Sequence, residues 1–501
     1  MRPEKKSNQP QVVNVPRSNH HLLLWSLLIV ALMRLSTLGM YPLMDKTEAR
    51  YAEIAREMVA TNNWVTPQLD PGVPFWGKPP FSFWLTAISF KIFGINELAA
   101  RLPSWILSVL TVYLVYLLGT KLKNQTLGLL SAIILSTTGL FLGSAGSVMT
   151  DPSLVFSMTL SMVALAMSFL AESTKDKKRW GYLFFVGAGI SFLAKGPVGW
   201  VLTFLPIVAW CIWHKQWKLL KINLPWGTGI LLTLIIAIPW YVLAEQATPG
   251  FLKYFFVGEH WQRFVQKGWA GDLYGSAHAQ FKGMIWFLMI PATMPWIFLL
   301  AAMAVRWFKD ERLHKLKDDV WLSYLVLWLL SPLVFFSLAS NILITYLLPS
   351  LPAFAILMAA ALRSFNEELT PRPWFFSFKA FKYTALFFPL VGLLAAMTFL
   401  PIEGRRNSQW DIARLFQELR KDQTGSLFYI QSMPQSADFY AGGDAILVQD
   451  HYQQRLETEL SDDNDDFFVI QKSDLNKFSP DLLTKIHKVG KFNKNILYRE
   501  M

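Results

Sequence analysis

Residues 152–171 read PSLVFSMTLSMVALAMSFLA and contain no charged side chain. A helix of this length, at about 1.5 Å per residue, crosses the roughly 30 Å hydrocarbon core of a bilayer. The stretch therefore predicts a membrane-spanning helix, and further apolar runs lie on both sides of it in the sequence.

Ten further apolar runs are long enough to be considered as spans. They lie near residues 22–41, 103–120, 126–145, 180–195, 197–213, 226–244, 283–305, 320–339, 342–362 and 383–401. With room for two short or re-entrant segments, we expect eleven to thirteen spans. Charged residues make up only 16% of the chain, against roughly 25% in soluble domains. The expected fold is an all-α polytopic membrane protein.

The net charge of +12 is not spread evenly along the chain. Residues 402–501 hold 13 Lys and Arg against 16 Asp and Glu, so the positive excess lies among the apolar runs. Basic connectors between spans follow from the positive-inside rule, which argues against a nucleic-acid partner. The only cysteine, Cys211, lies within an apolar run, so an intrachain disulfide is excluded.

The basic connectors also predict an orientation. If residues 1–21 are cytoplasmic, the Lys- and Arg-bearing segments 121–123, 175–179, 215–221, 306–317 and 363–382 all fall on the cytoplasmic side. In a bacterial inner membrane, loops 42–101 and 245–282 and the tail 402–501 then face the periplasm. We expect residues 22–401 to form the membrane domain. A helix-like segment 411–421 and short β-like runs 426–430, 445–448, 467–470 and 495–498 predict a small α/β domain after it.

The first long loop begins with a charged segment, Asp45-Lys46-Thr47-Glu48-Ala49-Arg50-Tyr51. We expect helices over 47–59 and 81–93. Asp45 and Glu48 would share one face of a helical turn, where a carboxylate pair suits a general base, a metal or an amino sugar. The same residues also suit helix capping, and the pattern alone leaves both interpretations open.

Three more charged residues stand at the edges of apolar runs. Lys78 precedes Pro79-Pro80, which hold it in an extended segment, and a fixed ammonium there suits a lipid phosphate or an ordinary basic loop. Asp151 begins the run 152–171, as a functional acid or a helix cap. Lys195 lies between two apolar runs, as a phosphate contact or a lysine that reaches to the interface.

The loop 245–282 contains Glu259, His260 and Arg263 close together. Adjacent Glu and His side chains suit a divalent metal, but two ligands do not define a metal site. Solvated polar residues are the alternative interpretation.

Several motifs together resemble a known family. MDKTEARYAEIAREM (44–58), WVTP (64–67), GKPPFSFWLTA (77–87), FGINELAARLPS (93–104), MTDPS (149–153), FLAKGP (192–197) and TYLLPSLPAFAIL (345–357) resemble the bacterial aminoarabinose transferase family. That family belongs to the GT-C-type integral-membrane glycosyltransferases, which include protein O-mannosyltransferases. The motifs keep the family order from about Tyr41 to Leu357.

The resemblance implies an enzyme that moves a sugar from a polyprenyl-phosphate carrier to a periplasm-facing acceptor. In the lipid A branch, the carrier is undecaprenyl phosphate, the sugar is aminoarabinose and the acceptor is a lipid A phosphate. It also implies site roles. We predict catalytic roles for Asp45, Asp151 and Glu48, donor-phosphate contacts from Arg50, Lys78 and Lys195, and substrate contacts from Tyr51, Tyr346, Glu259, His260 and Arg263.

Two positions depart from the family pattern. Gly77 stands where the family commonly has an acidic residue, so a metal site that includes His260 lacks an expected ligand and no cofactor is assigned. Asn341-Ile342-Leu343-Ile344 precede Thr345-Tyr346 without the lysine that is often found there, which points to a different sugar or acceptor.

Two alternatives stay open from the sequence. One is the same fold with a protein or another glycan as acceptor, as in the O-mannosyltransferases. The other is a transporter or lipid flippase, although the acidic residues cluster at one membrane surface and the chain shows no two related halves, unlike many transporters.

Overall fold

The structure is a computed structural model that describes residues 17–275, 278–309, 318–368, 378–420, 425–461 and 464–501. The predicted cytoplasmic N-terminus lies largely outside these residues. The basic connectors 306–317 and 363–382 also lie partly outside them.

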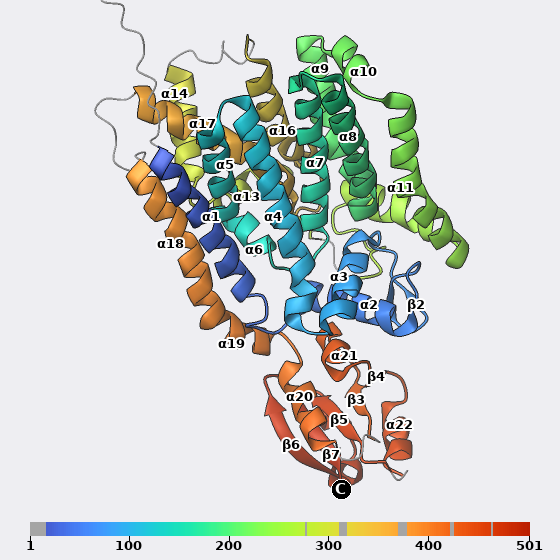
Figure 1. Ribbon diagram of the computed structural model, residues 1–501. Helices are drawn as coiled ribbons and strands as arrows, with labels where there is room; N and C mark the ends of the chain where they lie inside the picture. The colour runs from blue at the N-terminus through green and yellow to red at the C-terminus, as the bar shows by residue number, and fades with distance from the viewer. Residues whose placement is uncertain (1–16, 276–277, 310–317, 369–377, 421–424, 462–463) are drawn as a thin grey trace, which may run out of the picture.

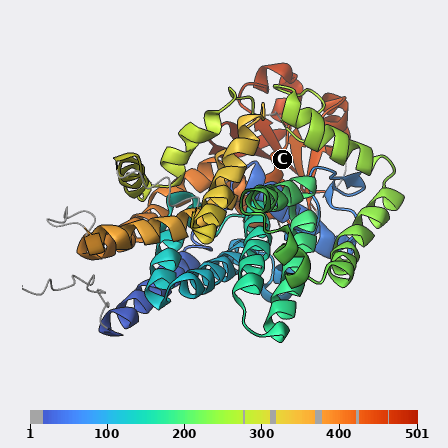
Figure 2. The ribbon, with the colours of Figure 1, turned by 90° about the horizontal axis from the view of Figure 1, so that it is seen from above.

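Most of the chain forms a bundle of helices with a small domain at one end (Figure 1). In the end-on view of Figure 2, α1 (blue) and α18 (orange) lie on one side of the bundle and α11 (light green) on the other. The longer helices are α1 (Arg17–Ser36), α4 (Glu97–Leu122), α5 (Gln125–Thr137), α7 (Asp151–Leu170), α8 (Thr174–Lys195), α9 (Pro197–His214), α11 (Trp226–Ala247), α14 (Ile297–Lys309), α16 (Val320–Ser337), α17 (Leu351–Glu368) and α18 (Phe378–Met397). Short elements between them are α6 (Gly139–Ser144), α10 (Trp217–Asn223), η1 (Lys253–Gln262), α12 (Arg263–Val265), α13 (Met284–Ala292), η3 (Ile344–Ser350) and α19 (Phe399–Arg406).

Polar side chains fix where several of these helices begin. The Asn96 side chain accepts a hydrogen bond from the Ala99 N–H at 2.9 Å and starts α4. Asn124 does the same for α5 through Leu127, and Ser173 for α8. Each side chain satisfies a backbone donor that the first helical turn leaves unpaired, which stabilises the helix by about 1 kcal/mol.

Fewer long spans are present than predicted. Among the described residues, six helices are long and apolar enough to cross a membrane, and the bent pair Tyr383–Met397 and Phe399–Arg406 gives a seventh. The prediction was eleven to thirteen. The run 126–145 divides into α5 and α6, and the run 283–305 divides into α13 and α14. The run 180–195 is the second part of α8, whose first turns are charged. The chain is a multi-pass membrane protein.

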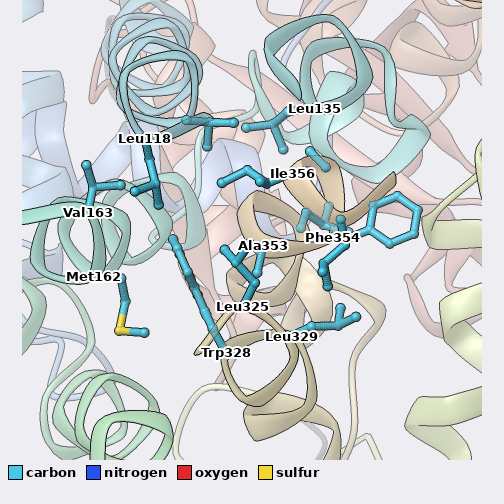
Figure 3. Packing of buried hydrophobic residues seen from close by; sticks show 14 of the residues in the cluster. Leu118, Leu135, Met162, Val163, Leu325, Trp328, Leu329, Ala353, Phe354 and Ile356 are labelled. Carbon is cyan, nitrogen blue, oxygen red and sulfur yellow. The ribbon is translucent and has the colours of Figure 1, made fainter. Parts of the chain in front are cut away.

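The bundle core surrounds α17 (Figure 3). Trp328 of α16 and Phe354 of α17 are fully buried there, together with Leu118, Leu135 and Val163 from α4, α5 and α7. Lipid tails are as apolar as leucine, so close packing between helices, more than removal from water, holds such a core together. Glycines permit this packing: a Cβ on Gly128 of α5 would lie 2.5 Å from the Tyr116 carbonyl oxygen of α4.

The first long loop folds against the end of the bundle. It contains α2 (Thr47–Thr61), the short strands β1 (Gln68–Asp70) and β2 (Val73–Pro74), and α3 (Phe81–Phe93). Both predicted helices are confirmed. Their buried residues, which include Ile54, Met58 and Phe83, form a core of their own that also contains Phe439 of the C-terminal domain.

The C-terminal domain is the predicted α/β unit. Its sheet has the order β4-β3-β5-β7-β6, in which β3 pairs in parallel with β4 and β5, and β7 runs antiparallel to β5 and β6. The four predicted β-like runs correspond to β3 (Leu427–Ile430), β4 (Ala445–Val448), β5 (Phe467–Gln471) and β7 (Asn495–Glu500). The helices are α20 (Trp410–Leu419), α21 (Gln435–Ala441), α22 (Tyr452–Glu459) and α23 (Pro480–Thr484). The prediction missed β6 (Ile486–Phe492), an edge strand with exposed lysines.

Helix α21 docks this domain onto α2. The Tyr440 hydroxyl accepts a hydrogen bond from the Leu43 N–H at 2.7 Å and donates one to the Glu97 carboxylate at 3.0 Å. Arg56 of α2 donates to the Gly442 carbonyl oxygen at 3.2 Å and binds the Glu53 carboxylate. These contacts join the C-terminal domain to the first loop.

The same interface brings acidic groups together. Asp438 is buried against Glu53, with Asp70 near it. Burial, and then the Glu53 charge, raise the pKa of Asp438 to about 8 in spite of Arg56. A carboxyl with a raised pKa stays protonated in the folded protein but ionises in the unfolded chain. Its burial therefore lowers the stability progressively as pH rises from about 4 to about 8.

We expect Asp438→Asn to weaken this pH dependence, because the amide keeps a donor toward Glu53 and carries no charge. The thermal midpoint of the purified protein in detergent, followed by tryptophan fluorescence, should fall less between pH 5 and pH 8 than in the wild type. Asp481→Asn, at an exposed site in the same domain, is the control. Equal slopes for wild type and Asp438→Asn would contradict the assignment.

Candidate active site

Two loops meet through a buried ion-pair network. The Lys78 ammonium, held before Pro79, binds the Glu259 carboxylate and also donates to the Gly77 carbonyl oxygen at 2.6 Å. Arg263 binds both Glu259 oxygens at 2.8 and 2.9 Å, and its Nη1 lies 3.4 Å from the Asp272 carboxylate. Burial raises the pKa of Glu259, but Lys78 and Arg263 outweigh it and hold that pKa below its usual value. Glu259 is therefore an ionised carboxylate between two cations.

A second ion pair joins α7 and α8. The Lys195 ammonium lies 2.7 Å from Asp151 and 5.1 Å from the centre of the Tyr346 ring. The chain geometry explains why Lys195 ends its helix, because Pro197 cannot continue α8 and Gly196 adopts a positive φ of 65°. A Cβ on Gly196 would lie 2.7 Å from the Phe255 ring, so the site also needs glycine for space.

Tyr51 lies within electrostatic reach of both ion pairs. Burial raises the pKa of its phenol to about 12, and the charges of Arg50, Asp151, Glu259 and Lys195 also act on it. The phenol is therefore neutral and can donate a hydrogen bond. The structure thus places residues of α2, α7, α8 and η1 near one another.

Two guanidinium groups in this region keep unused donors. The Nε atoms of Arg50 and Arg263 are buried and have no hydrogen-bond partner among the residues that the structure describes. An unpaired buried donor costs free energy, more so when it carries charge. A ligand with anionic oxygens would satisfy both groups.

A small pocket opens beside Tyr51, between α3, α4 and the start of α7. Its wall includes the hydroxyl-bearing residues Ser82, Thr86, Ser104 and Ser153. The Ser82 hydroxyl is buried and unpaired within the described part of the chain. The pocket therefore has a wall of mixed hydroxyl-bearing and apolar residues, and Tyr51 is the site residue that lines it.

The residues do not fit a metal centre. The two ring nitrogens of His260 lie 2.8 Å from the Phe255 carbonyl oxygen and 3.1 Å from that of Lys195, and burial lowers the pKa of the imidazole. A Cβ on Gly77 would lie 2.8 Å from the Phe75 ring, so an acidic residue there would have to displace that ring. Within the described residues, no three His, Cys, Asp or Glu side chains form a group that would hold a metal.

Asp45 lies at the domain boundary. Its carboxylate accepts a hydrogen bond from the Ser436 N–H at 2.9 Å and a second from the Ser436 hydroxyl. Burial raises the pKa of Asp45, although Ser436, Arg50 and Lys46 all act to lower it. The sequence did not indicate this contact, because Ser436 is 391 residues away.

Glu48 has different partners from Asp45. Its carboxylate lies 2.9 Å from Arg101 Nη2 and accepts the Val148 N–H at 3.1 Å. Arg101 is fully buried and also donates to the carbonyl oxygens of Leu38 and Tyr41, each at 2.8 Å. This geometry favours a structural role for Glu48, and its catalytic role is not carried into our proposal. Sequence reasoning missed Arg101, although a charged residue at the start of an apolar span is a signal for such a site.

Comparison with known proteins relates the chain to membrane glycosyltransferases. A family model described as dolichyl-phosphate-mannose-protein mannosyltransferase matches residues 24–255. An undecaprenyl phosphate-alpha-4-amino-4-deoxy-L-arabinose arabinosyl transferase of Pseudomonas aeruginosa (strain UCBPP-PA14) is 32% identical over 346 residues, which are 68% of this chain and 59% of the relative. The undecaprenyl phosphate-alpha-4-amino-4-deoxy-L-arabinose arabinosyl transferase 2 of Pseudomonas fluorescens (strain Pf0-1) is 30% identical over 338 residues, which are 67% of this chain and 58% of the relative. The chain thus spans less than two thirds of the length of these relatives.

Solved structures share the fold. ArnT from Cupriavidus metallidurans bound to undecaprenyl phosphate superposes with a TM-score of 0.77 at 19% identity, over 96% of this chain and 98% of that one. An Archaeoglobus fulgidus oligosaccharyltransferase gives a TM-score of 0.51 at 13% identity, over 90% of this chain and 70% of that one. By sequence, the chain belongs to the family that contains the aminoarabinosyl transferases, and it shares the fold of ArnT.

Proposed function

We propose that the protein transfers aminoarabinose from undecaprenyl phosphate to a phosphate of lipid A at the periplasmic face of the inner membrane. The observation that carries the proposal is the convergence of Arg50, Lys78, Lys195 and Arg263, two of which keep buried unpaired donors. Such a group of cations suits the phosphate of a lipid carrier. The names of the matched transferases supply the sugar and the carrier.

The proposed reaction uses these charges on the leaving group. An acceptor oxygen forms a bond to the anomeric carbon, the bond from that carbon to the carrier phosphate breaks, and its electron pair passes to the phosphate oxygen. Lys78, Lys195 and the two arginines stabilise the charge that develops on this oxygen.

Asp45 acts on the acceptor side. If the acceptor is a hydroxyl, Asp45 takes its proton as the new bond forms. If the acceptor is an ionised phosphate, no proton is transferred, and Asp45 orients the acceptor or stabilises positive charge on the sugar. Asp151 instead contacts Lys195 and orients this cation on the donor side. His260 and Tyr346 complete the proposed substrate contacts.

The proposed orientation is a cytoplasmic N-terminus and a periplasmic C-terminal domain. It rests on the basic connectors between spans. The ion pairs of loops 42–101 and 245–282 would then lie at the periplasmic boundary, where a carrier phosphate sits.

A second acceptor class has its own support, because the matched family model describes protein mannosyltransferases. A protein or another glycan would then replace lipid A. The donor site would use the same cations.

The acceptor is tested by mass spectrometry of lipid A from a deletion strain and from the same strain carrying the gene. We expect aminoarabinose-bearing lipid A only when the protein is present. Lipid A that is identical in the two strains, together with changed glycoproteins or surface glycans, would favour the second class.

The donor site is tested by Arg50→Ala. Loss of a charge-assisted hydrogen bond costs about 1.5–3 kcal/mol, so we expect undecaprenyl phosphate to bind roughly 10- to 100-fold more weakly. The rise in thermal midpoint with ligand concentration measures this binding. Arg414→Ala, which removes an exposed arginine of α20, should bind as the wild type does. Unchanged affinity in Arg50→Ala would place the phosphate elsewhere.

The acceptor side is tested by Asp45→Asn. We expect transfer to lipid A to fall by about 10²- to 10³-fold, the size of effect that one group stabilising charge in a transition state has, while undecaprenyl phosphate still stabilises the protein. Initial rates with purified donor and lipid A measure the loss. A variant that keeps its transfer rate would remove Asp45 from the mechanism.

A further inference from the structure

The contact between Asp45 and Ser436 joins the proposed active-site loop to the C-terminal domain. One residue, Ser436, supplies both of the donors that the carboxylate receives, one from its backbone and one from its hydroxyl. The Asp45 N–H donates to the Asn407 carbonyl oxygen at 2.8 Å. The segment 402–501 therefore holds Asp45 by its main chain and by its side chain.

We propose that the C-terminal domain is a working part of the active site, with Ser436 as the positioning residue that holds the Asp45 carboxylate in place for transfer. The inference rests on the proposed function, in which Asp45 acts on the acceptor side. It assigns a role to a domain that the catalytic motifs do not reach, since they end near Leu357.

The surroundings of Ser436 make it a rigid support. Ser436 is fully buried, and its hydroxyl also accepts the Gln409 N–H at 2.9 Å. Ser436 lies in the first turn of α21, whose Tyr440 accepts the Leu43 N–H and whose final cap residue, Gly442, accepts a hydrogen bond from Arg56 of α2. A donor held on two sides in this way limits the directions that the carboxylate can adopt.

The geometry leaves Asp45 able to react. A carboxylate offers about four lone-pair sites, and Ser436 uses two of them. The other groups that face Asp45 are Lys46 and Arg50 on its own segment and the Tyr429 phenol of β3. Loss of the Ser436 hydroxyl would loosen the carboxylate and disfavour its ionised form.

The test is Ser436→Ala in the full-length protein, assayed for transfer from undecaprenyl phosphate-aminoarabinose to lipid A across a range of pH. The hydroxyl favours ionised Asp45, so its removal should move the acidic limb of kcat/KM to higher pH by about one unit. We expect kcat to fall more than the KM for the donor changes. Ser479→Ala removes a helix cap in the same domain, at α23, and should leave the limb where it is.

A uniform loss of rate with an unmoved limb in Ser436→Ala, or a profile equal to that of the wild type, would overturn the inference. If Ser436→Ala does not fold, Ser436→Cys replaces it. A thiol is a weaker donor, so the limb should move in the same direction by a smaller amount, and an unmoved limb would again overturn the inference.

A second measurement separates this inference from the proposed function. Infrared difference titration of the carboxyl band, with Asp45→Asn as reference, reports Asp45 without any substrate. If the wild type shows no transfer, the proposed function fails. The contact between Ser436 and Asp45 is then tested by the infrared titration alone, and an Asp45 titration that Ser436→Ala leaves unchanged would refute it. If Asp45→Asn abolishes transfer but Ser436→Ala shifts neither profile, only the inference fails.

Discussion

The Glu259 carboxylate between Lys78 and Arg263 is the interaction on which the proposed site depends. It ties the loop after the first helix to the loop after α11, two segments that are far apart in the sequence. A buried charge is costly unless it is paired, and removal of one partner leaves the others uncompensated. The two loops are therefore held in one arrangement, with Tyr51 within electrostatic reach of Glu259.

Much of the site was predictable because membrane segments make charged residues conspicuous. Lys78 before two prolines, Asp151 at the start of an apolar run and Lys195 at the end of another all stood out in the sequence. The structure brings Asp151 and Lys195 together, and it brings Lys78 to Glu259. What the sequence could not supply was the pairing, because no local rule connects α7 with α8 or one loop with another.

The fold, like the site, was predictable from local sequence only in part. Apolar composition predicted the membrane bundle, and alternation in the tail predicted four of its five strands. Among the described residues, fewer helices have the length and apolarity of a full span than the sequence predicted, because an apolar run does not reveal where a helix breaks: α5 and α6 divide one run, and α13 and α14 divide another. Glu48 was grouped with Asp45 by helical spacing, yet Arg101 holds it in a buried ion pair. Partners that are distant in sequence, such as Arg101 for Glu48 and Ser436 for Asp45, determine the environment of a side chain that a local pattern singles out.

The C-terminal domain changes how such an enzyme is pictured. It is small and lies at one end of the bundle (Figure 1). The motifs alone would give it no role in the reaction. Its helix α21 instead reaches the start of α2, beside the residues proposed to act on substrate. A domain that contacts Asp45 can affect transfer without any contact to the carrier.

The cations around Tyr51 are proposed to form the binding site of the carrier phosphate. The most direct measurement is an electron cryomicroscopy structure of the protein in lipid nanodiscs with undecaprenyl phosphate bound. The account predicts phosphate density in contact with the Arg50 and Arg263 guanidinium groups and next to Lys78 or Lys195. Phosphate density outside this group, with Lys78, Lys195 and Arg263 still in their ion pairs, would contradict it.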